Sequence, residues 1–216
     1  MGDLSGDPFQ AARLLLTLRR EGVTDPNLLK LIEATNRCDF AGAEFAGLAF
    51  EDVYLPTPCG QAVLPPLATA QILQAGALQL EETGRVLLVG AGSGYMAALA
   101  APLCARLIAA ERYRRLAREA GARLEALGYE NVTVRHADGL TGLVEEGAYD
   151  RILLTGTIGQ VPDTLVEALA PGGFIVAPAI DGDGGTIRLV GNGGEITRRG
   201  LSRQLQPLKH GVSAAL

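Results

Sequence analysis

The residues whose types and spacing most clearly indicate chemistry are three glycines within five positions, in the run Gly90-Ala91-Gly92-Ser93-Gly94. The run follows the apolar stretch 86–89 and precedes a segment rich in alanine and leucine, so it connects a predicted strand to a predicted helix. Glycine lets the backbone turn tightly and approach a ligand closely, and the amino end of a helix favours negative charge. The run therefore predicts a cofactor loop, although an ordinary strand-to-helix turn has the same composition.

The spacing of these glycines separates two classes of cofactor. The dinucleotide fingerprint needs a third glycine or alanine at the position of Tyr95, which is too bulky for close packing of helix against strand. The tighter Gly-x-Gly-x-Gly spacing resembles class I methyltransferases, which bind S-adenosylmethionine. We therefore expect Gly90, Gly92, Ser93 and Gly94 to contact S-adenosylmethionine, and a nicotinamide cofactor ranks last among the alternatives.

Acidic residues follow the next two predicted strands. Glu111 comes directly after 107–110, and Asp138-Gly139 follows the strand predicted at 131–135. A carboxylate at a strand's carboxyl end beside the glycine turn can accept both hydroxyls of a ribose, which is the role expected of Glu111. Asp138 and Gly139 are placed to meet the amino group of an adenine. Glu111 is also compatible with a helix N-cap and Asp138-Gly139 with a simple turn, but together the strand ends predict one crevice.

The elements that would hold this crevice alternate along the chain from residue 85. Strands are predicted at 86–89, 106–110, 131–135, 150–155 and 173–177, and helices at 94–104, 112–127 and 162–170. Strands separated by helices predict an α/β fold, with the doubly wound, mostly parallel sheet of Rossmann-like methyltransferases. The stretches 186–190 and 195–201 flank Gly-Asn-Gly-Gly and predict an antiparallel C-terminal hairpin.

The first third of the chain predicts an N-terminal helical cap. Apolar residues recur at helical spacing in 8–20, and Asp25-Pro26 has the pattern of an N-cap followed by proline at the first helical position. Residues 50–66 are rich in Pro, Gly and Thr without periodicity and predict a loop, and a helix is expected again at 66–78. We expect a single domain over 1–216, with the cap and a substrate-side loop in 1–80, a cofactor-binding core in 81–180 and an antiparallel segment in 181–216.

Composition and charge oppose several classes of function. The formal net charge is −5 over 216 residues, which opposes a surface built to bind nucleic acid. No run of 18 or more apolar residues and no secretory signal at the start are found, so we expect no membrane partner and a cytoplasmic location. Three cysteines without a Cys-x-x-Cys pair and two histidines argue against a metal site.

Beyond the glycine turn, the chain resembles the protein-L-isoaspartate O-methyltransferases, particularly the shorter bacterial kind. The matching segments are 18–23 with Asp25, 51–56, 59–61, 92–95, 127–132, 138–142, 149–153, 161–162 and 169–173. The Asp-Gly-x-x-Gly run at 138–142 and the Gly60-Gln61 pair are fairly specific to this family. The Gly-x-Gly-x-Gly and Pro-Gly-Gly runs occur in many methyltransferases.

The resemblance implies methyl transfer from S-adenosylmethionine to the α-carboxyl group of an L-isoaspartyl residue in a damaged protein or peptide. The ester then collapses to a succinimide, which partly reopens as normal aspartate. A carboxyl group with a pKa of about 4 is already ionised at pH 7, so the reaction needs no general base. The resemblance also implies an acceptor cleft lined by Gln61, Val63, Leu64, Thr155 and Thr157.

One position in that cleft differs from the family. Leu64 stands where the resemblance places a serine associated with catalysis, and a leucine cannot donate a hydrogen bond, so the catalytic residue stays unassigned. Leu88 likewise stands where the family commonly has an acidic residue, two positions before the first glycine. Three interpretations stay open: a protein-carboxyl methyltransferase, a nucleoside-binding homologue with weak or no activity, and a methyltransferase for a less polar acceptor.

Overall fold

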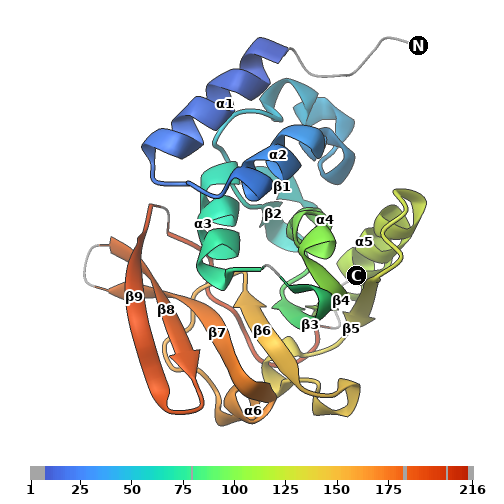
Figure 1. The fold of residues 1–216 in the computed structure, drawn as a ribbon. Coiled ribbons are helices and arrows are strands. Elements are labelled where there is room, and N and C mark those ends of the chain that lie inside the picture. Colours follow the sequence, from blue (N-terminus) through green and yellow to red (C-terminus); the bar gives the residue numbers. More distant parts are fainter. Residues whose placement is uncertain (1–7, 79, 182–183, 203, 214–216) are drawn as a thin grey trace.

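A seven-stranded sheet forms the centre of the structure, a computed structural model that describes residues 8–78, 80–181, 184–202 and 204–213 (Figure 1). The strands are β3 (Leu80–Val89), β4 (Cys104–Glu111), β5 (Val132–His136), β6 (Tyr149–Leu154), β7 (Leu169–Asp181), β8 (Gly184–Gly191) and β9 (Gly194–Leu201). Their order across the sheet is β5-β4-β3-β6-β7-β8-β9. Strands β3 to β7 pair in parallel, whereas β8 pairs antiparallel with both β7 and β9. The predicted α/β fold, with a mostly parallel sheet and an antiparallel C-terminal hairpin, is confirmed.

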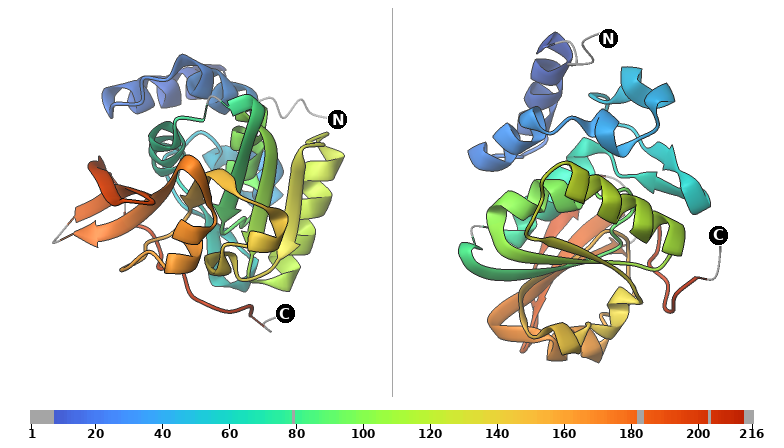
Figure 2. Two further views of the ribbon diagram at one scale, coloured as in Figure 1. Left: turned by 60° about the horizontal axis from the view of Figure 1, so that its bottom comes forward. Right: turned by 90° about the vertical axis from the view of Figure 1, so that its right-hand side faces the viewer.

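The central strands are apolar on both faces because helices cover both sides of the sheet. In β3, Val86 and Leu88 belong to one core cluster, whereas Leu87 and Val89 belong to the other. Helices α3 (Pro66–Gly76), α4 (Tyr95–Ala100) and α5 (Arg114–Ala126) lie on the first side. Helix α6 (Asp163–Glu167) and the 3-10 turns η5 (Gly139–Thr141) and η6 (Val144–Glu146) lie on the second side (Figure 2). The sheet is therefore doubly wound.

The N-terminal helices α1 (Pro8–Arg20) and α2 (Pro26–Ala34) form a cap that packs on α3. Asp25 starts α2 as expected: its carboxylate accepts hydrogen bonds from the backbone N–H groups of Asn27 and Leu28, and Pro26 opens the helix. The turns η1 (Arg37–Phe40) and η2 (Ala43–Leu48) follow α2 and lie at the same end of the molecule as the cap (Figure 1). The division of the domain at residues 80 and 180 stays a prediction.

The segment predicted as a loop at 50–66 instead contains a small antiparallel hairpin. It pairs β1 (Leu55–Thr57) with β2 (Gln61–Val63), and the 3-10 turn η3 (Pro58–Gly60) connects them. Cys59 in this turn has a left-handed backbone, with φ of 63°. Because each strand has three residues and the turn is rich in proline and glycine, the sequence shows no alternation that would reveal the hairpin.

Two predicted helices are shorter than expected. The helix predicted at 94–104 ends at Ala100, and the 3-10 turn η4 (Ala101–Leu103) follows because Pro102 has no backbone N–H to continue the helix. The helix predicted at 162–170 ends at Glu167, because Leu169 already pairs with Tyr149 as the first residue of β7. Pairing in the sheet thus prevails over local helix propensity at the start of β7.

Candidate active site

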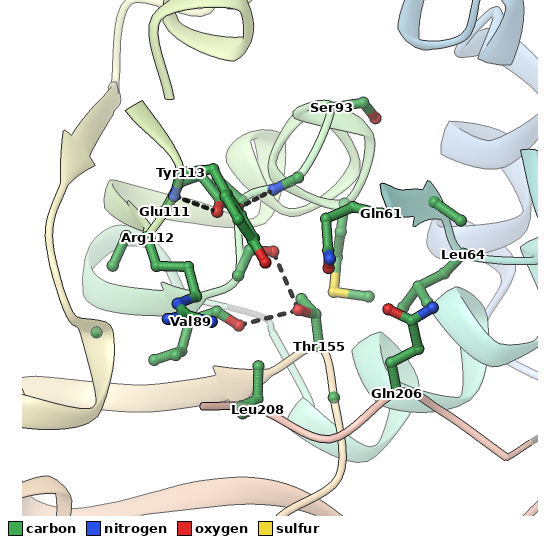
Figure 3. Close-up of a pocket in the computed structure, with 18 of the residues that line it drawn as sticks. Gln61, Leu64, Val89, Ser93, Glu111, Arg112, Tyr113, Thr155, Gln206 and Leu208 are labelled. Carbon is green, nitrogen blue, oxygen red and sulfur yellow. Dashed lines mark hydrogen bonds between the residues drawn. The ribbon is translucent and has the colours of Figure 1, made fainter. Parts of the chain in front are cut away.

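The candidate active site is a cavity of about 390 Å³ at the carboxyl edge of the parallel strands (Figure 3). It lies where the strand order reverses, because the chain continues from β3 to β4 on one side while β6 and β7 lie on the other. The wall is formed by 60–64, 89–93, 110–113, 137–140, 155–156 and 206–209, with Tyr54, Thr69, Tyr95 and Met96. The volume is within the range of small-molecule sites.

The glycine turn at the end of β3 has a backbone that needs glycine. Gly90 has φ of +93°, and a Cβ atom there would lie 2.1 Å from Thr155 Oγ1. Gly92 has φ of +55° and open space where its Cβ would be. Gly94 precedes α4 and packs against Leu124, so it shapes the turn without lining the cavity. The turn thus presents residues 90–93 to the cavity.

Glu111, the last residue of β4, ties the glycine turn to the neighbouring strand end. Its side chain is buried, with 5% of the residue's surface exposed, and Oε2 accepts a hydrogen bond from Gly92 N at 2.8 Å. Oε1 accepts one from Tyr113 N at 2.9 Å. Tyr113 itself is the N-cap residue of α5, so Glu111 is not the helix cap that its sequence position also allowed. Each carboxylate oxygen keeps a second acceptor site.

Asp138 lies two residues after the end of β5, in the same wall, but a distant segment already binds its carboxylate. Oδ1 accepts from Leu140 N at 3.0 Å, and Oδ2 accepts from Gly211 N at 2.6 Å. At Gly139, a Cβ atom would lie 2.8 Å from side-chain carbons of both Ala110 and Val89, so only glycine fits under the cavity floor. Asp138 therefore borders the cavity and also anchors the C-terminal segment.

The two threonines after β6 hold the backbone. Thr155 Oγ1 lies 3.0 Å from the carbonyl oxygens of Val89 and Gly90, to which it can donate, and it packs against the glycine turn. Thr157 lies outside the cavity wall and is buried, because its backbone pairs with the C-terminal segment. Thr155 thus reaches the cavity and Thr157 does not.

The side of the cavity where the acceptor is expected comes from the β1–β2 hairpin. It depends on a buried arginine that sequence reasoning did not single out. Gln61 and Val63 of β2 line the cavity together with Leu64, which follows the strand. Arg37, 2% exposed, donates to the carbonyl oxygens of Val53 at 2.6 Å and Leu64 at 3.0 Å, and to three further carbonyls of Leu48, Ala49 and Glu51. Burial lowers the pKa of Arg37 from its usual value. One guanidinium therefore connects the backbone of 48–53 with that of Leu64, at the two ends of the hairpin.

The C-terminal segment 204–213 closes the cavity, and its aperiodic sequence gave no signal for this position. Gln206, Pro207, Leu208 and Lys209 line the wall. The backbone is fixed because Thr157 N donates to Gln206 O at 3.0 Å and Leu208 N donates to Thr157 O at 2.9 Å. Tyr54 Oη donates to Gln204 O at 2.6 Å, so the segment also contacts the hairpin side.

Within the described ranges, no three or more His, Cys, Asp and Glu side chains are grouped so that they could hold a metal ion. A helix of sufficient length and apolarity to cross a bilayer is likewise not found among the residues described.

The comparisons with known proteins agree on one family. Residues 10–192 match the family model described as protein-L-isoaspartate(D-aspartate) O-methyltransferase. A protein-L-isoaspartate O-methyltransferase of Maricaulis maris is 39% identical over 207 residues, which cover 94% of this chain and 96% of that protein. One of Paramagnetospirillum magneticum is 40% identical over 195 residues, 90% of this chain and 88% of that protein. A crystal structure of a protein so described from Plasmodium falciparum, in complex with S-adenosyl-L-homocysteine, shares the fold with a TM-score of 0.76 at 19% identity, covering 91% of this chain and 97% of that one.

A doubly wound sheet with a glycine turn and acidic residues at its carboxyl edge is the fold of Rossmann-like methyltransferases, and the matching family model is one of methyltransferases. Within that class, this chain belongs to the protein-L-isoaspartate(D-aspartate) O-methyltransferase family. The expectation drawn from the sequence motifs is thereby confirmed at the level of the family.

Proposed function

We propose that this protein transfers a methyl group from S-adenosylmethionine to the α-carboxyl group of L-isoaspartyl residues in damaged proteins or peptides. The observation that carries the proposal is the convergence of the glycine turn, Glu111 and Asp138 on one side of a single cavity, with the hairpin residues 60–64 on the other. The family of the chain and the names of its relatives support the same reaction.

The hydrogen-bonding groups of the cavity fit the adenosine part of the cofactor. Glu111 offers two free acceptor sites on a buried carboxylate, which match the two hydroxyl groups of a ribose. Several wall residues have no side chain or a short one, so the backbone can come close to a bound nucleoside. These residues are Gly90, Gly92, Ser93 and Gly139. Asp138 Oδ2 already accepts Gly211 N, so Asp138 would bind the adenine amino group with its remaining acceptor sites.

The chain's task in this reaction is orientation. When bound, S-adenosylmethionine supplies a methyl group on a positively charged sulfur. Transfer of that methyl group to a carboxylate oxygen, with sulfur keeping the bonding pair, would need no proton transfer, so the chain would have no acid or base to supply. The glycine turn and Glu111 would hold the donor, and the hairpin and residues 206–209 would position the acceptor and exclude water. Such orientation can supply roughly 7–11 kcal/mol of the barrier.

Leu64 supports a second candidate, a homologue that binds the nucleoside without transferring the methyl group. Its hydrocarbon side chain lines the acceptor side of the cavity (Figure 3). Loss of one donor at a reacting oxygen can lower a rate by about 10²–10³. A less polar acceptor is the third possibility that this leucine would suit.

Two measurements separate these candidates. Calorimetry with S-adenosylhomocysteine tests the cofactor site, and the proposal fails if no heat of binding is found at millimolar ligand. Transfer of a tritiated methyl group to an isoaspartyl peptide, beside the same peptide with normal aspartate, tests the acceptor. Binding without transfer supports the inactive homologue, and the variant Leu64→Ser should then gain activity.

The cytoplasmic location and the absence of nucleic-acid, membrane and metal partners stay predictions.

A further inference from the structure

The cavity wall that contains Leu64 also contains an amide without a hydrogen bond in the described part of the fold. Gln206 lines the cavity, and in Figure 3 its side chain extends from the C-terminal segment toward Leu64, with the amide of Gln61 on the other side. Gln206 is exposed, and its amide has no hydrogen-bond partner among the residues that the structure describes. A donor is thus available in the same cavity wall as the position where a hydroxyl is missing.

We propose, on the basis of the proposed function, that Gln206 binds the acceptor carboxylate and takes the place of a hydroxyl group at residue 64. The amide would donate one Nε2–H to the carboxylate of the isoaspartyl residue. Its carbonyl oxygen stays able to accept from a backbone N–H of the same peptide. This combination selects a polypeptide acceptor and disfavours the less polar acceptor that Leu64 alone would suit.

The position of Gln206 is preorganised by its backbone. Its carbonyl oxygen accepts from Thr157 N at 3.0 Å, three residues after the end of β6, and Leu208 N donates back to Thr157 O at 2.9 Å. On either side of this bridge, Gln204 O is bound by Tyr54 Oη, and Gly211 N is bound to Asp138. The segment is therefore fastened to the hairpin side and to two strand ends, and only the side chain of Gln206 has to adjust to a substrate.

Four other neutral polar groups of the wall are less suited to this role. The Tyr54 hydroxyl is committed to Gln204 O, and the Thr155 hydroxyl to the carbonyls of Val89 and Gly90. The Thr69 hydroxyl has no partner within the described ranges, but its oxygen is fully covered and cannot meet a ligand without rotation of the side chain. The Gln61 amide is partly used, since Nε2 lies 3.4 Å from Cys59 O.

A neutral amide also suits the chemistry. The attacking group is a carboxylate oxygen whose electron pair forms the new bond to carbon. A cation bound to that oxygen would hold the pair more strongly than a neutral N–H, because hydrogen bonds between ionised partners are the stronger ones. Gln206 can therefore orient the carboxylate while leaving it nucleophilic.

The test uses the full chain and the isoaspartyl peptide, with Gln206→Ala, Gln206→Leu and Gln206→Glu compared with the parent. We expect kcat/KM for the peptide to fall about 10- to 100-fold in the first two variants, as for loss of a hydrogen bond to a charged group. Gln206→Glu should lose more, because its carboxylate repels that of the acceptor. Affinity for S-adenosylhomocysteine should be unchanged in all three, and Gln204→Ala, an exposed glutamine outside the wall, is the matched control.

The double variant Leu64→Ser with Gln206→Ala decides whether the two positions share one task. If they do, removing the amide should matter much less when a serine is present than in the parent. The inference is overturned if Gln206→Ala keeps the parent's kcat/KM, or if its loss is the same in both backgrounds. A parent that binds S-adenosylhomocysteine but methylates no isoaspartyl peptide would instead overturn the proposed acceptor, and the inference with it.

Discussion

The two sides of the cavity are built in different ways. The side proposed to bind the cofactor consists of strand ends and the turns that follow them, and hydrogen bonds from Gly92 N and Tyr113 N to Glu111 connect these parts. The acceptor side is assembled from a hairpin, a 3-10 turn of the cap and the C-terminal segment, which are far apart in sequence. The first side depends on sheet topology, whereas the second depends on a few long-range hydrogen bonds.

This difference explains where the chain tolerates an unusual residue. The glycine turn is constrained by backbone geometry, as the 2.1 Å approach of a Cβ at Gly90 to Thr155 shows. Leu64, by contrast, is held through its backbone carbonyl by Arg37, a contact that does not depend on the identity of its side chain, although that side chain also packs against the core. An acceptor site held by backbone carbonyls can change its side chains while its shape is kept.

The largest effect should come from breaking the acceptor side at Arg37. Arg37→Met leaves the carbonyls of Glu51, Val53 and Leu64 without their donor, and we expect the free energy of unfolding to fall by about 3 kcal/mol. Urea unfolding measures this loss. Transfer to the isoaspartyl peptide should fall much more than affinity for S-adenosylhomocysteine.

Arg37→Lys is the matched control, since it keeps the charge but not the planar fork of donors, and an intermediate loss is expected. Equal losses of peptide transfer and cofactor affinity in Arg37→Met would contradict the independence of the two sides.

The cofactor side is broken most directly at Glu111. Glu111→Ala removes the acceptor of Gly92 N and Tyr113 N and the proposed partner of the ribose. Affinity for S-adenosylhomocysteine, measured by calorimetry, should fall about 100-fold, because each hydrogen bond to a charged group contributes about 1.5–3 kcal/mol. Glu111→Gln, which keeps one oxygen acceptor, should lose less. An unchanged affinity in Glu111→Ala would place the ribose elsewhere.

The smallest effect is expected on the pH dependence of stability, and it comes from Tyr95, which lies between the two sides of the cavity. Its ring lies 6.0 Å from the Arg37 guanidinium carbon and 5.6 Å from the ring of Phe40, and burial raises the pKa of its hydroxyl to about 12. The pKa of the hydroxyl is higher in the folded chain than its unfolded value of about 10. The contribution of the neutral hydroxyl to stability is therefore complete below pH 10 and is lost as the pH rises toward 12. At pH 11 we expect about 1 kcal/mol less stability from this group alone.

Urea unfolding of the parent and Tyr95→Phe at pH 9 and pH 11 checks this expectation. The variant should lose less stability between the two pH values than the parent does. The same decline in both proteins would assign the alkaline loss to other groups.

The contrast between the sides also decides how much could be predicted from the sequence. The alternation of strands and helices predicts the parallel sheet, and parallel strands end at one edge, so the meeting of Glu111 and Asp138 follows from their positions after strands. Their roles toward a cofactor stay predictions.

The acceptor side could not be predicted in the same way. Arg37 lies 27 residues before Leu64, and no periodicity marks it as the donor to five carbonyls. The hairpin is too short to alternate, and the segment with Gln206 has neither strand nor helix pattern. These contacts arise only when the fold brings distant segments together, because backbone carbonyls carry no residue-specific signal.

The bridge made by Glu111 has a consequence for repeated cycles of catalysis. The N–H groups of Gly92 and Tyr113 are satisfied by the protein itself, so departure of a spent nucleoside leaves neither of them orphaned. The loop need not reorganise each time product is exchanged for fresh donor. The conformational entropy of that loop is therefore lost once, when the chain folds, and not again at every turnover.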